Sequence, residues 1–330
     1  MKRRATVNDV AKLARVGGST VSRYLRGIPV RPNIAERVAR AVDELGYAPD
    51  ETARALRLGR TRTIGMIVPR VANPFFSLAV QCMEEEIQQR GCTMILLTHQ
   101  DRMAQQASHL ATLLRCKVDG VILTAAPATT LQNVRSVLPD VPIVAFDAFL
   151  SSEVDSVFLG NREAAFSATE HLLAHGHTQI ACLTAKEHIY SYQQRIAGYS
   201  DAMTRHNLKS ILMTAPDYDT LRSALKASIQ SNKPPAALLA LSDVGSLNVL
   251  RAFDELGMSR SQYLPFVGFD DPDFAALIDP PLTVIRQPIR KMAHATLRLL
   301  FQRIDESAPH EAQQMTLPGE LLCRRSCGCA

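Results

Sequence analysis

The chain has 330 residues and carries 37 Lys and Arg against 32 Asp and Glu, a formal net charge of +5 at pH 7. With 46% hydrophobic and 21% charged residues it can bury a real core, which excludes general disorder. The longest uncharged apolar run, near residues 235–241, is far below the ~20 residues that a membrane-spanning helix needs. Seven scattered Cys, an odd number, favour a reduced cytoplasmic protein.

The positive charge is concentrated at one end of the chain. Residues 1–60 contain 13 Lys and Arg against six Asp and Glu, whereas residues 61–330 contain 24 against 26. A basic segment attached to a near-neutral one is typical of a polyanion-binding head on a body with another task. At ~150 residues per domain, the length suggests about two domains besides this head.

Residues 6–46 have the pattern of three short helices. Thr6 and Asp9 can cap the first helix, and a Gly-containing break at residues 15–18 separates it from the second, at residues 19–25. Pro32 suits the start of a third helix that stops at Gly46. This spacing predicts a DNA-binding helix-turn-helix. The alternative is a plain three-helix subdomain with solvated arginines. The second helix offers the following residues outward: Gly18, Ser19, Thr20, Ser22 and Arg23.

Beyond residue 63, short apolar runs alternate with amphipathic segments. The predicted strands are 64–68, 94–97, 121–123, 143–146, 180–183, 237–241 and 265–268. Alternating strands and helices predict parallel, doubly wound sheets, and the length suffices for two lobes of this kind. We therefore expect an α/β protein with a small all-α head.

Many short motifs, in order and over almost the whole chain, closely resemble the lactose/galactose repressor family. They include Thr6-Val-Asn-Asp9, Thr20-Val-Ser-Arg23, Asn73-Pro-Phe-Phe76, His171-Leu-Leu-Ala-His-Gly-His177, Gly198-Tyr199, Val267-Gly-Phe-Asp270 and Pro281-Leu-Thr-Val-Ile-Arg-Gln287. The resemblance implies a helix-turn-helix domain at 1–48, a hinge helix and linker at 49–61, and a core at 62–330 like the two-lobed periplasmic binding proteins. The expected lobes are 62–159 with 288–313, and 160–287 with 314–330.

The resemblance also implies DNA contacts. In the family the second helix lies in the major groove, so that Gly18, Ser19 and Arg23 would face base edges while Thr20 and Ser22 hold phosphates. Leu56 of the hinge helix would wedge into the minor groove, unless it is a buried leucine of a fourth helix. Thr6 and Ala55 complete the candidate contacts. Family members bind pseudo-palindromic operators as homodimers, and their effector controls the ordering of the hinge helix.

A small-molecule cleft between the lobes is the second implied site. Its candidate contacts are Asn73, Phe75, Thr124, Asp147, Arg195, Ser242, Asp270 and Gln287. Carboxylates and a guanidinium form charge-assisted hydrogen bonds, which suits vicinal hydroxyls or a sugar-acid carboxylate. Together with the resemblance, this implies a sugar, sugar phosphate or sugar acid as effector, with a nucleobase as the alternative. Two alternatives stay open, a simple Arg195–Asp147 pair and an Asp270 that only caps a turn.

Other reactive side chains are interpreted as structural. His171, His175 and His177 have a metal-like spacing, but they coincide with the family's helix-end motif, with Gly176 as C-cap. The tail cysteines lack a fourth spaced ligand and are expected to fray; they are Cys323, Cys327 and Cys329. The sequence holds no P-loop, G-x-G-x-x-G, H-E-x-x-H or G-x-S-x-G motif. We therefore predict no metal, no cofactor, no catalytic residue and no enzymatic activity.

The predicted function is a ligand-responsive transcriptional repressor of carbohydrate or sugar-acid metabolism genes. It would bind double-stranded operator DNA as a homodimer, in the bacterial cytoplasm at the nucleoid and without membrane association. Two other classes stay open. A sugar-binding receptor without a DNA role would be expected to have a signal peptide and no basic head. An enzyme would use the cleft, with Asp147, Asp243 and Asp270 as acid–base candidates.

Overall fold

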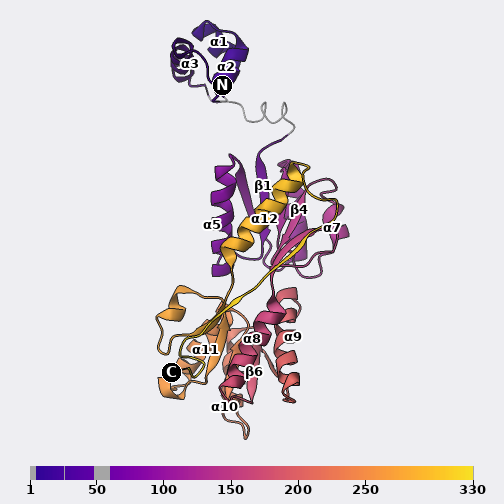
Figure 1. Ribbon diagram of the computed structural model, residues 1–330, viewed down its shortest axis with the longest axis vertical. Helices are drawn as coiled ribbons and strands as arrows, with labels where there is room; N and C mark the ends of the chain where they lie inside the picture. Colours follow the sequence, from indigo (N-terminus) through magenta and orange to yellow (C-terminus); the bar gives the residue numbers. More distant parts are fainter. Residues whose placement is uncertain (1–4, 26, 48–59, 330) are drawn as a thin grey trace. The chain divides into compact units, whose positions relative to one another are not determined.

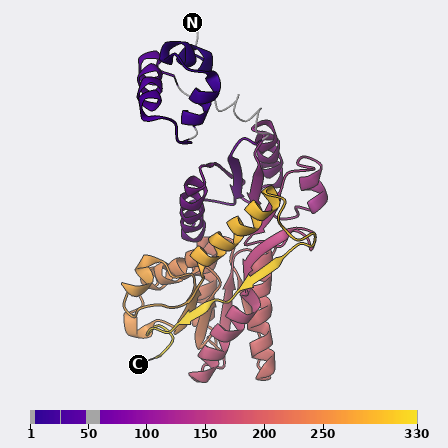
Figure 2. The same ribbon diagram turned by 45° about the horizontal axis from the view of Figure 1, so that its top comes forward.

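The computed structural model describes residues 5–25, 27–47 and 60–329 (Figures 1 and 2). The chain divides into two compact units, Met1–Thr61 and Arg62–Ala330, which are described separately below. Among the described helices, none combines the length and the apolar character needed to cross a bilayer.

The first unit contains the three predicted helices, α1 (Val7–Ala14), α2 (Gly18–Leu25) and α3 (Pro32–Leu45). The Thr6 hydroxyl accepts the Asp9 N–H, and the Asp9 carboxylate accepts the Thr6 N–H at 2.8 Å, so the predicted cap of α1 is confirmed. α3 ends at Gly46 in the left-handed conformation, as predicted. Side chains from all three helices form one small core, which includes Val10, Ala14, Val21, Val38 and Ala41.

The first lobe of the second unit is a parallel sheet with strand order β11-β5-β4-β3-β1-β2. The strands are β1 (Thr63–Val68), β2 (Thr93–Thr98), β3 (Gly120–Leu123), β4 (Ile143–Phe146), β5 (Asp155–Leu159) and β11 (Gln314–Leu317). One face packs against α5 (Pro74–Gln89) and α12 (Ile289–Ile304). The other packs against α6 (Met103–Arg115) and α7 (Leu131–Arg135). Helices on both faces bury the central strands β1, β3, β4 and β5 almost completely, as expected for a doubly wound sheet, whereas the edge strands β2 and β11 are only partly buried.

The second lobe repeats this plan with strand order β12-β10-β9-β8-β6-β7. Its strands are β6 (Ile180–Thr184), β7 (Ile211–Thr214), β8 (Ala237–Ala240), β9 (Phe266–Phe269), β10 (Thr283–Arg286) and β12 (Glu320–Leu322), of which β12 is antiparallel to β10. α8 (Asn161–Ala174) and α9 (Tyr190–Arg205) cover one face. α10 (Tyr218–Ile229) and α11 (Asp243–Glu255) cover the other.

The chain crosses between the lobes three times, after β5, after β10 and after β11. The last crossing is the long yellow segment of Figures 1 and 2. The predicted lobe boundary before residue 314 is wrong, because β11 pairs with β5 in the first lobe. The chain therefore enters the second lobe between Leu317 and Glu320, after it has completed the edge of the first sheet.

One glycine explains how closely two helices of the second lobe approach each other. A Cβ atom added at Gly198 of α9 would lie 2.0 Å from the carbonyl oxygen of Arg162 in α8. Tyr199, beside it, is fully buried and its hydroxyl donates to the Ile180 carbonyl at 2.7 Å. The Gly198-Tyr199 pair therefore sets the α8–α9 packing that supports β6.

Candidate functional site

The outward face of α2 carries the side chains predicted to contact DNA. Ser19 and Arg23 are exposed, whereas Val21 on the opposite face is fully buried. Gly18, Thr20 and Ser22 are partly exposed between these extremes. The Arg23 guanidinium donates to the Pro29 carbonyl at 3.3 Å, which holds this long side chain near the end of α2. Short polar side chains beside an exposed arginine provide donors and acceptors for base edges and phosphates.

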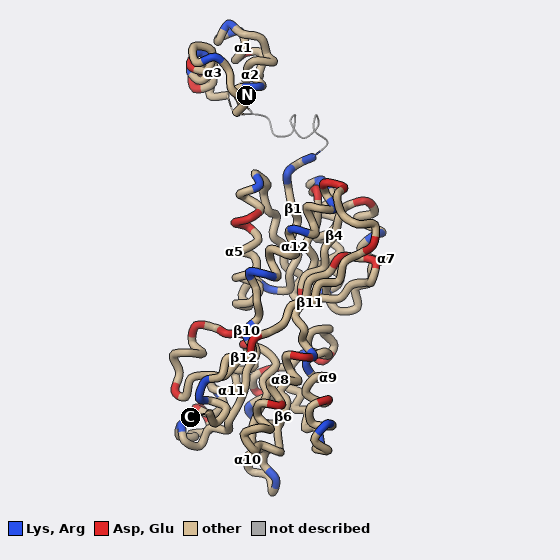
Figure 3. The backbone as a smooth tube through the Cα atoms, viewed as in Figure 1, with Lys and Arg blue, Asp and Glu red and all other residues tan. Residues whose placement is uncertain are grey.

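The head that carries this face is basic. Among its described residues the Lys and Arg positions, coloured blue along the backbone in Figure 3, outnumber the acidic ones. Thr6 is exposed, but its hydroxyl is engaged in the α1 cap, so its DNA contact stays a prediction. Ala55, Leu56 and the hinge-helix prediction lie outside the described residues.

A cavity of about 560 Å³ separates the two lobes of the second unit. Its walls are formed by segments that follow the carboxyl ends of strands, where doubly wound sheets generally bind ligands. All the predicted effector contacts line it: Asn73, Phe75, Thr124, Asp147, Arg195, Ser242, Asp270 and Gln287. Residues from both lobes, up to 214 positions apart in sequence, are thus brought into one site.

Two carboxylates occupy equivalent positions in the two lobes. Asp147 follows β4 with φ of 51°, and Asp270 follows β9 with φ of 67°. Each backbone N–H is held at 2.9 Å by a carbonyl of the next strand, Val157 for Asp147 and Ile285 for Asp270. Left-handed conformations are uncommon for non-glycine residues and are often found at functional sites. Each sheet therefore fixes one carboxylate at the rim of the cavity.

Burial raises the pKa of two carboxylates, Asp147 and Asp243. It raises the pKa of Asp147 to about 7; nearby Arg195 opposes this shift and Asp270 adds to it. The Asp147 Oδ1 atom is buried without a hydrogen-bond partner. Burial and the charge of Asp270 raise the pKa of Asp243, at the start of α11, to about 6. Asp270 accepts a hydrogen bond from Gln287 Nε2 at 2.6 Å, which argues against the alternative that it only caps a turn.

Arg195 is fixed in the second-lobe wall. Its exposed fraction is 4%; Nε donates to Asn161 Oδ1 at 2.7 Å and Nη1 to the Leu241 carbonyl at 2.6 Å. The guanidinium lies over the Phe269 ring, 4.2 Å from its centroid. Neither hydrogen-bond partner is a carboxylate, so the alternative of a simple Arg195–Asp147 pair finds no support. A buried cation held by neutral groups keeps its charge available to a ligand.

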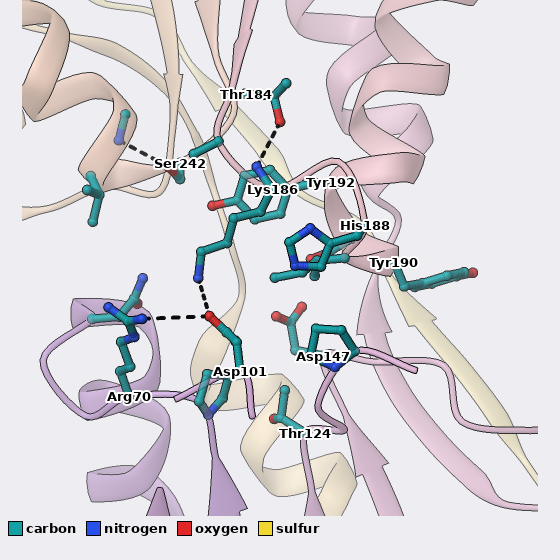
Figure 4. Close-up of a pocket in the computed structure, with 18 of the residues that line it drawn as sticks. Arg70, Asp101, Thr124, Asp147, Thr184, Lys186, His188, Tyr190, Tyr192 and Ser242 are labelled. Carbon is teal, nitrogen blue, oxygen red and sulfur yellow. Dashed lines mark hydrogen bonds and ion pairs between the residues drawn. The ribbon is translucent and has the colours of Figure 1, made fainter. Parts of the chain in front are cut away.

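Polar contacts join the lobes across the cavity. Lys186 of the second lobe donates to Asp101 of the first at 2.7 Å, and Arg70 lies 3.9 Å from the same carboxylate (Figure 4). Asn73 Nδ2 donates to Asp243 at 3.4 Å. Asp101 and Lys186 were not among the predicted effector contacts. Each follows the end of a strand, β2 for Asp101 and β6 for Lys186, and this position is the sequence signal that could have identified them as cavity residues.

Aromatic side chains form the apolar part of the walls. Phe75 stacks on Phe146 with ring centroids 5.7 Å apart. Tyr190 and Tyr192, at the start of α9, line the cavity from the second lobe (Figure 4). Aromatic faces combined with a few fixed polar groups are typical of a small-molecule site.

Comparisons with known proteins find relatives of both units of the chain. Residues 6–50 match the family "Bacterial regulatory proteins, lacI family", and residues 169–327 match a periplasmic binding protein-like domain. The chain is 32% identical over 329 residues to the HTH-type transcriptional repressor PurR of Vibrio campbellii, with 98% of each chain covered. It is 31% identical to PurR of Vibrio vulnificus, with 97% of this chain and 98% of that protein covered.

Solved structures resemble the chain over nearly its full length. The lac repressor dimer bound to operator and the anti-inducer ONPF has a TM-score of 0.85 at 25% identity, with 98% of this chain and 99% of that chain covered. The transcriptional regulator CelR in complex with cellobiose has a TM-score of 0.70 at 28% identity, with 98% and 100% covered.

A helix-turn-helix head followed by a two-lobed ligand-binding core defines the class of ligand-responsive transcriptional regulators. The chain belongs to the LacI family of bacterial regulatory proteins. The predicted fold and the predicted class, a ligand-responsive transcriptional repressor, are therefore confirmed. The carbohydrate class of the effector and the roles of individual site residues stay predictions.

Proposed function

We propose that this chain is a cytoplasmic repressor that senses a sugar or sugar acid and binds a pseudo-palindromic operator as a homodimer. The observation that carries the proposal is the interlobe cavity lined by all the predicted effector contacts. Hydrogen-bond donors and acceptors are fixed at strand ends of both lobes, so a ligand that binds to both sets can change the arrangement of one lobe relative to the other. We infer binding without chemistry, since the relatives are named as repressors.

The chemistry of the unpartnered atoms favours a polyhydroxylated effector. Asp147 Oδ1 and Gln287 Oε1 are buried acceptors without a partner among the described residues. Buried acceptors need donors, and each one left unsatisfied costs ~1–3 kcal/mol. Sugar hydroxyls donate to such oxygens and accept from Arg195, and sugar-ring faces stack on aromatic side chains. The cellobiose complex of CelR supports this assignment for the same fold.

Calorimetry with the full chain tests the effector. The panel comprises neutral sugars, sugar acids, sugar phosphates and, as a contrasting class, purine bases. We expect at least one polyhydroxylated compound to bind, and Arg195→Ala to abolish that binding while operator affinity is kept. Recovery of the ligand unchanged by NMR checks that no turnover occurs. Binding of purines alone, or wild-type affinity in Arg195→Ala, would refute the assignment.

Gel-shift titration tests the DNA-binding face. A bidentate arginine–guanine contact is worth ~1–3 kcal/mol, so Arg23→Ala should weaken specific operator binding by roughly ten- to hundred-fold. Lys12→Ala, a basic change on α1 outside the proposed reading face, is the control. Unchanged operator affinity and salt dependence in Arg23→Ala would contradict the base-reading role. The dimer bound to operator in the lac repressor structure supports the symmetric arrangement proposed for this chain.

A further inference from the structure

Four thiol and imidazole groups meet in the second lobe, outside the interlobe cavity. They are His171, His175, Cys327 and Cys329, here named the thiol–imidazole cluster. The predicted frayed cysteine tail is wrong, because Cys327 is fully buried and its neighbour Ser326 is only 5% exposed. The two ligands that complete the cluster, His171 and His175, come from the end of α8, more than 150 residues earlier.

The ligand atoms of the cluster lie at, or a few tenths of an ångström below, the separations found in a tetrahedral metal site. His171 Nε2 lies 3.2 Å from Cys327 Sγ and 3.6 Å from Cys329 Sγ. Cys329 Sγ lies 3.1 Å from His175 Nε2 and 3.2 Å from Cys327 Sγ. Zinc bonds of ~2.3 Å to sulfur and ~2.0 Å to nitrogen place tetrahedral ligands about 3.3–3.8 Å apart. All four ligand atoms lie within 4.8 Å of one another, so one ion can reach them all.

Local structure explains why these groups converge. His171 and His175 are four residues apart at the end of α8, so both project from the same helix face. Cys327 and Cys329 flank Gly328, whose φ of +93° few other residues adopt. This turn directs both sulfur atoms to one side. Cys-x-Cys and His-x₃-His spacings on separate elements thus supply two ligands each.

A neighbouring hydroxyl orients the buried sulfur. Thr283 Oγ1 donates to Cys327 Sγ at 3.1 Å and accepts the Arg324 backbone N–H at 2.8 Å. Groups of this kind orient metal ligands, and their hydrogen bonds stabilise thiolate charge.

We propose that the thiol–imidazole cluster binds one Zn²⁺ as a structural site. Each cysteine loses its proton on binding, so two thiolates and two neutral imidazoles balance the charge of the ion. The ion connects the end of α8 to the segment that follows β12. This connection anchors the chain just after its last crossing between the lobes.

Metal analysis of the full chain tests the proposal. Protein purified under reducing conditions without chelator should contain about one zinc ion per chain, measured by inductively coupled plasma mass spectrometry. After the zinc is removed, Co²⁺ should bind and give the absorption bands of tetrahedral thiolate coordination. His175→Gln and Cys329→Ser should each lower zinc affinity at least about tenfold. Because His175 is exposed, its replacement separates loss of metal from loss of fold, which circular dichroism checks.

Two cysteine variants are matched controls. Cys323 Sγ lies 3.9 Å from the other ring nitrogen of His171 and is not one of the four ligands, so Cys323→Ser should keep the zinc. Cys116→Ser, an exposed thiol of the first lobe, should keep it as well. The proposal is overturned if the purified and the zinc-supplied proteins both hold no metal, or if Cys323→Ser loses as much as Cys329→Ser. A Cys327–Cys329 disulfide found in the reduced protein also overturns it.

Discussion

Replacement of Asp147 by Asn should remove a pH-dependent loss of stability. Burial raises the pKa of Asp147 to about 7, far above the ordinary 3.8. Between these two values the folded state holds a proton that the unfolded chain has lost, so stability falls as the pH rises through this window and is constant above it. Asn has the same shape, does not titrate, and tolerates the φ of 51° at this position.

The two pKa values give the size of the effect. Linkage predicts a loss of at most ~2.6 kcal/mol between pH 5 and pH 8 for the wild type. Asp147 is only partly buried, and solvent screening reduces this figure, so we expect about 1–2 kcal/mol. Asp147→Asn should therefore gain that much relative to the wild type when the pH is raised from 5 to 8.

Urea unfolding of the full chain measures this difference. The chain has no Trp, so unfolding is followed by far-ultraviolet circular dichroism, at one fixed protein concentration because a dimer's stability depends on it. Asp273→Asn, at an exposed carboxylate, is the matched control and should follow the wild type. If Asp147→Asn and the wild type lose stability in parallel from pH 5 to 8, Asp147 is already ionised at pH 5 and the burial argument is wrong.

Two further predictions concern the backbone. Arg15 ends α1 in the left-handed conformation with φ of 53°, which strains the backbone of a residue that has a Cβ atom. Arg15→Gly should therefore stabilise the head by about 0.5–1 kcal/mol, measured as two- to fivefold slower hydrogen exchange in α1. Unchanged hydrogen exchange would show that Arg15 is not strained. Gly198→Ala places a Cβ atom 2.0 Å from the Arg162 carbonyl oxygen and should lower the free energy of unfolding by at least ~2 kcal/mol. The control Ser200→Ala, on the same helix, should change the free energy of unfolding by less than ~0.5 kcal/mol. Equal effects of the two substitutions would refute the close-approach argument.

Seven strands were predictable from the sequence as short apolar runs, namely the edge strand β2 and the central strands β1, β3, β4, β6, β8 and β9. The other three edge strands, β7, β11 and β12, and the central strands β5 and β10 were not predicted. β7 and β11 are four residues long and alternate between exposed and half-buried positions, too short for a periodicity to stand out. β5 begins with Asp155 and Ser156, which look like loop residues. The Asp155 carboxylate is paired with Arg303 at 2.7 Å, and this tertiary contact permits its burial.

The site was predictable where side chains follow recognisable motifs and not where distant segments meet. The family resemblance located the predicted cavity residues, but it did not indicate the Lys186–Asp101 contact, which joins two loops 85 positions apart. The thiol–imidazole cluster was missed for the same reason. Ligand counting along the tail cannot detect histidines that the α8–tail packing brings beside it.

The equivalence of the two lobes suggests how the proposed effector acts on them. Asp147 and Asp270 follow equivalent strands, and the charge of Asp270 contributes to the raised pKa of Asp147. Two carboxylates from opposite lobes repel each other whenever the lobes approach and both are ionised. A ligand whose hydroxyls donate to both carboxylates removes this repulsion and satisfies the free acceptor of Gln287. Since a ligand shifts an equilibrium only by its differential affinity, a polyhydroxylated effector favours the lobe arrangement in which both carboxylates reach it at once.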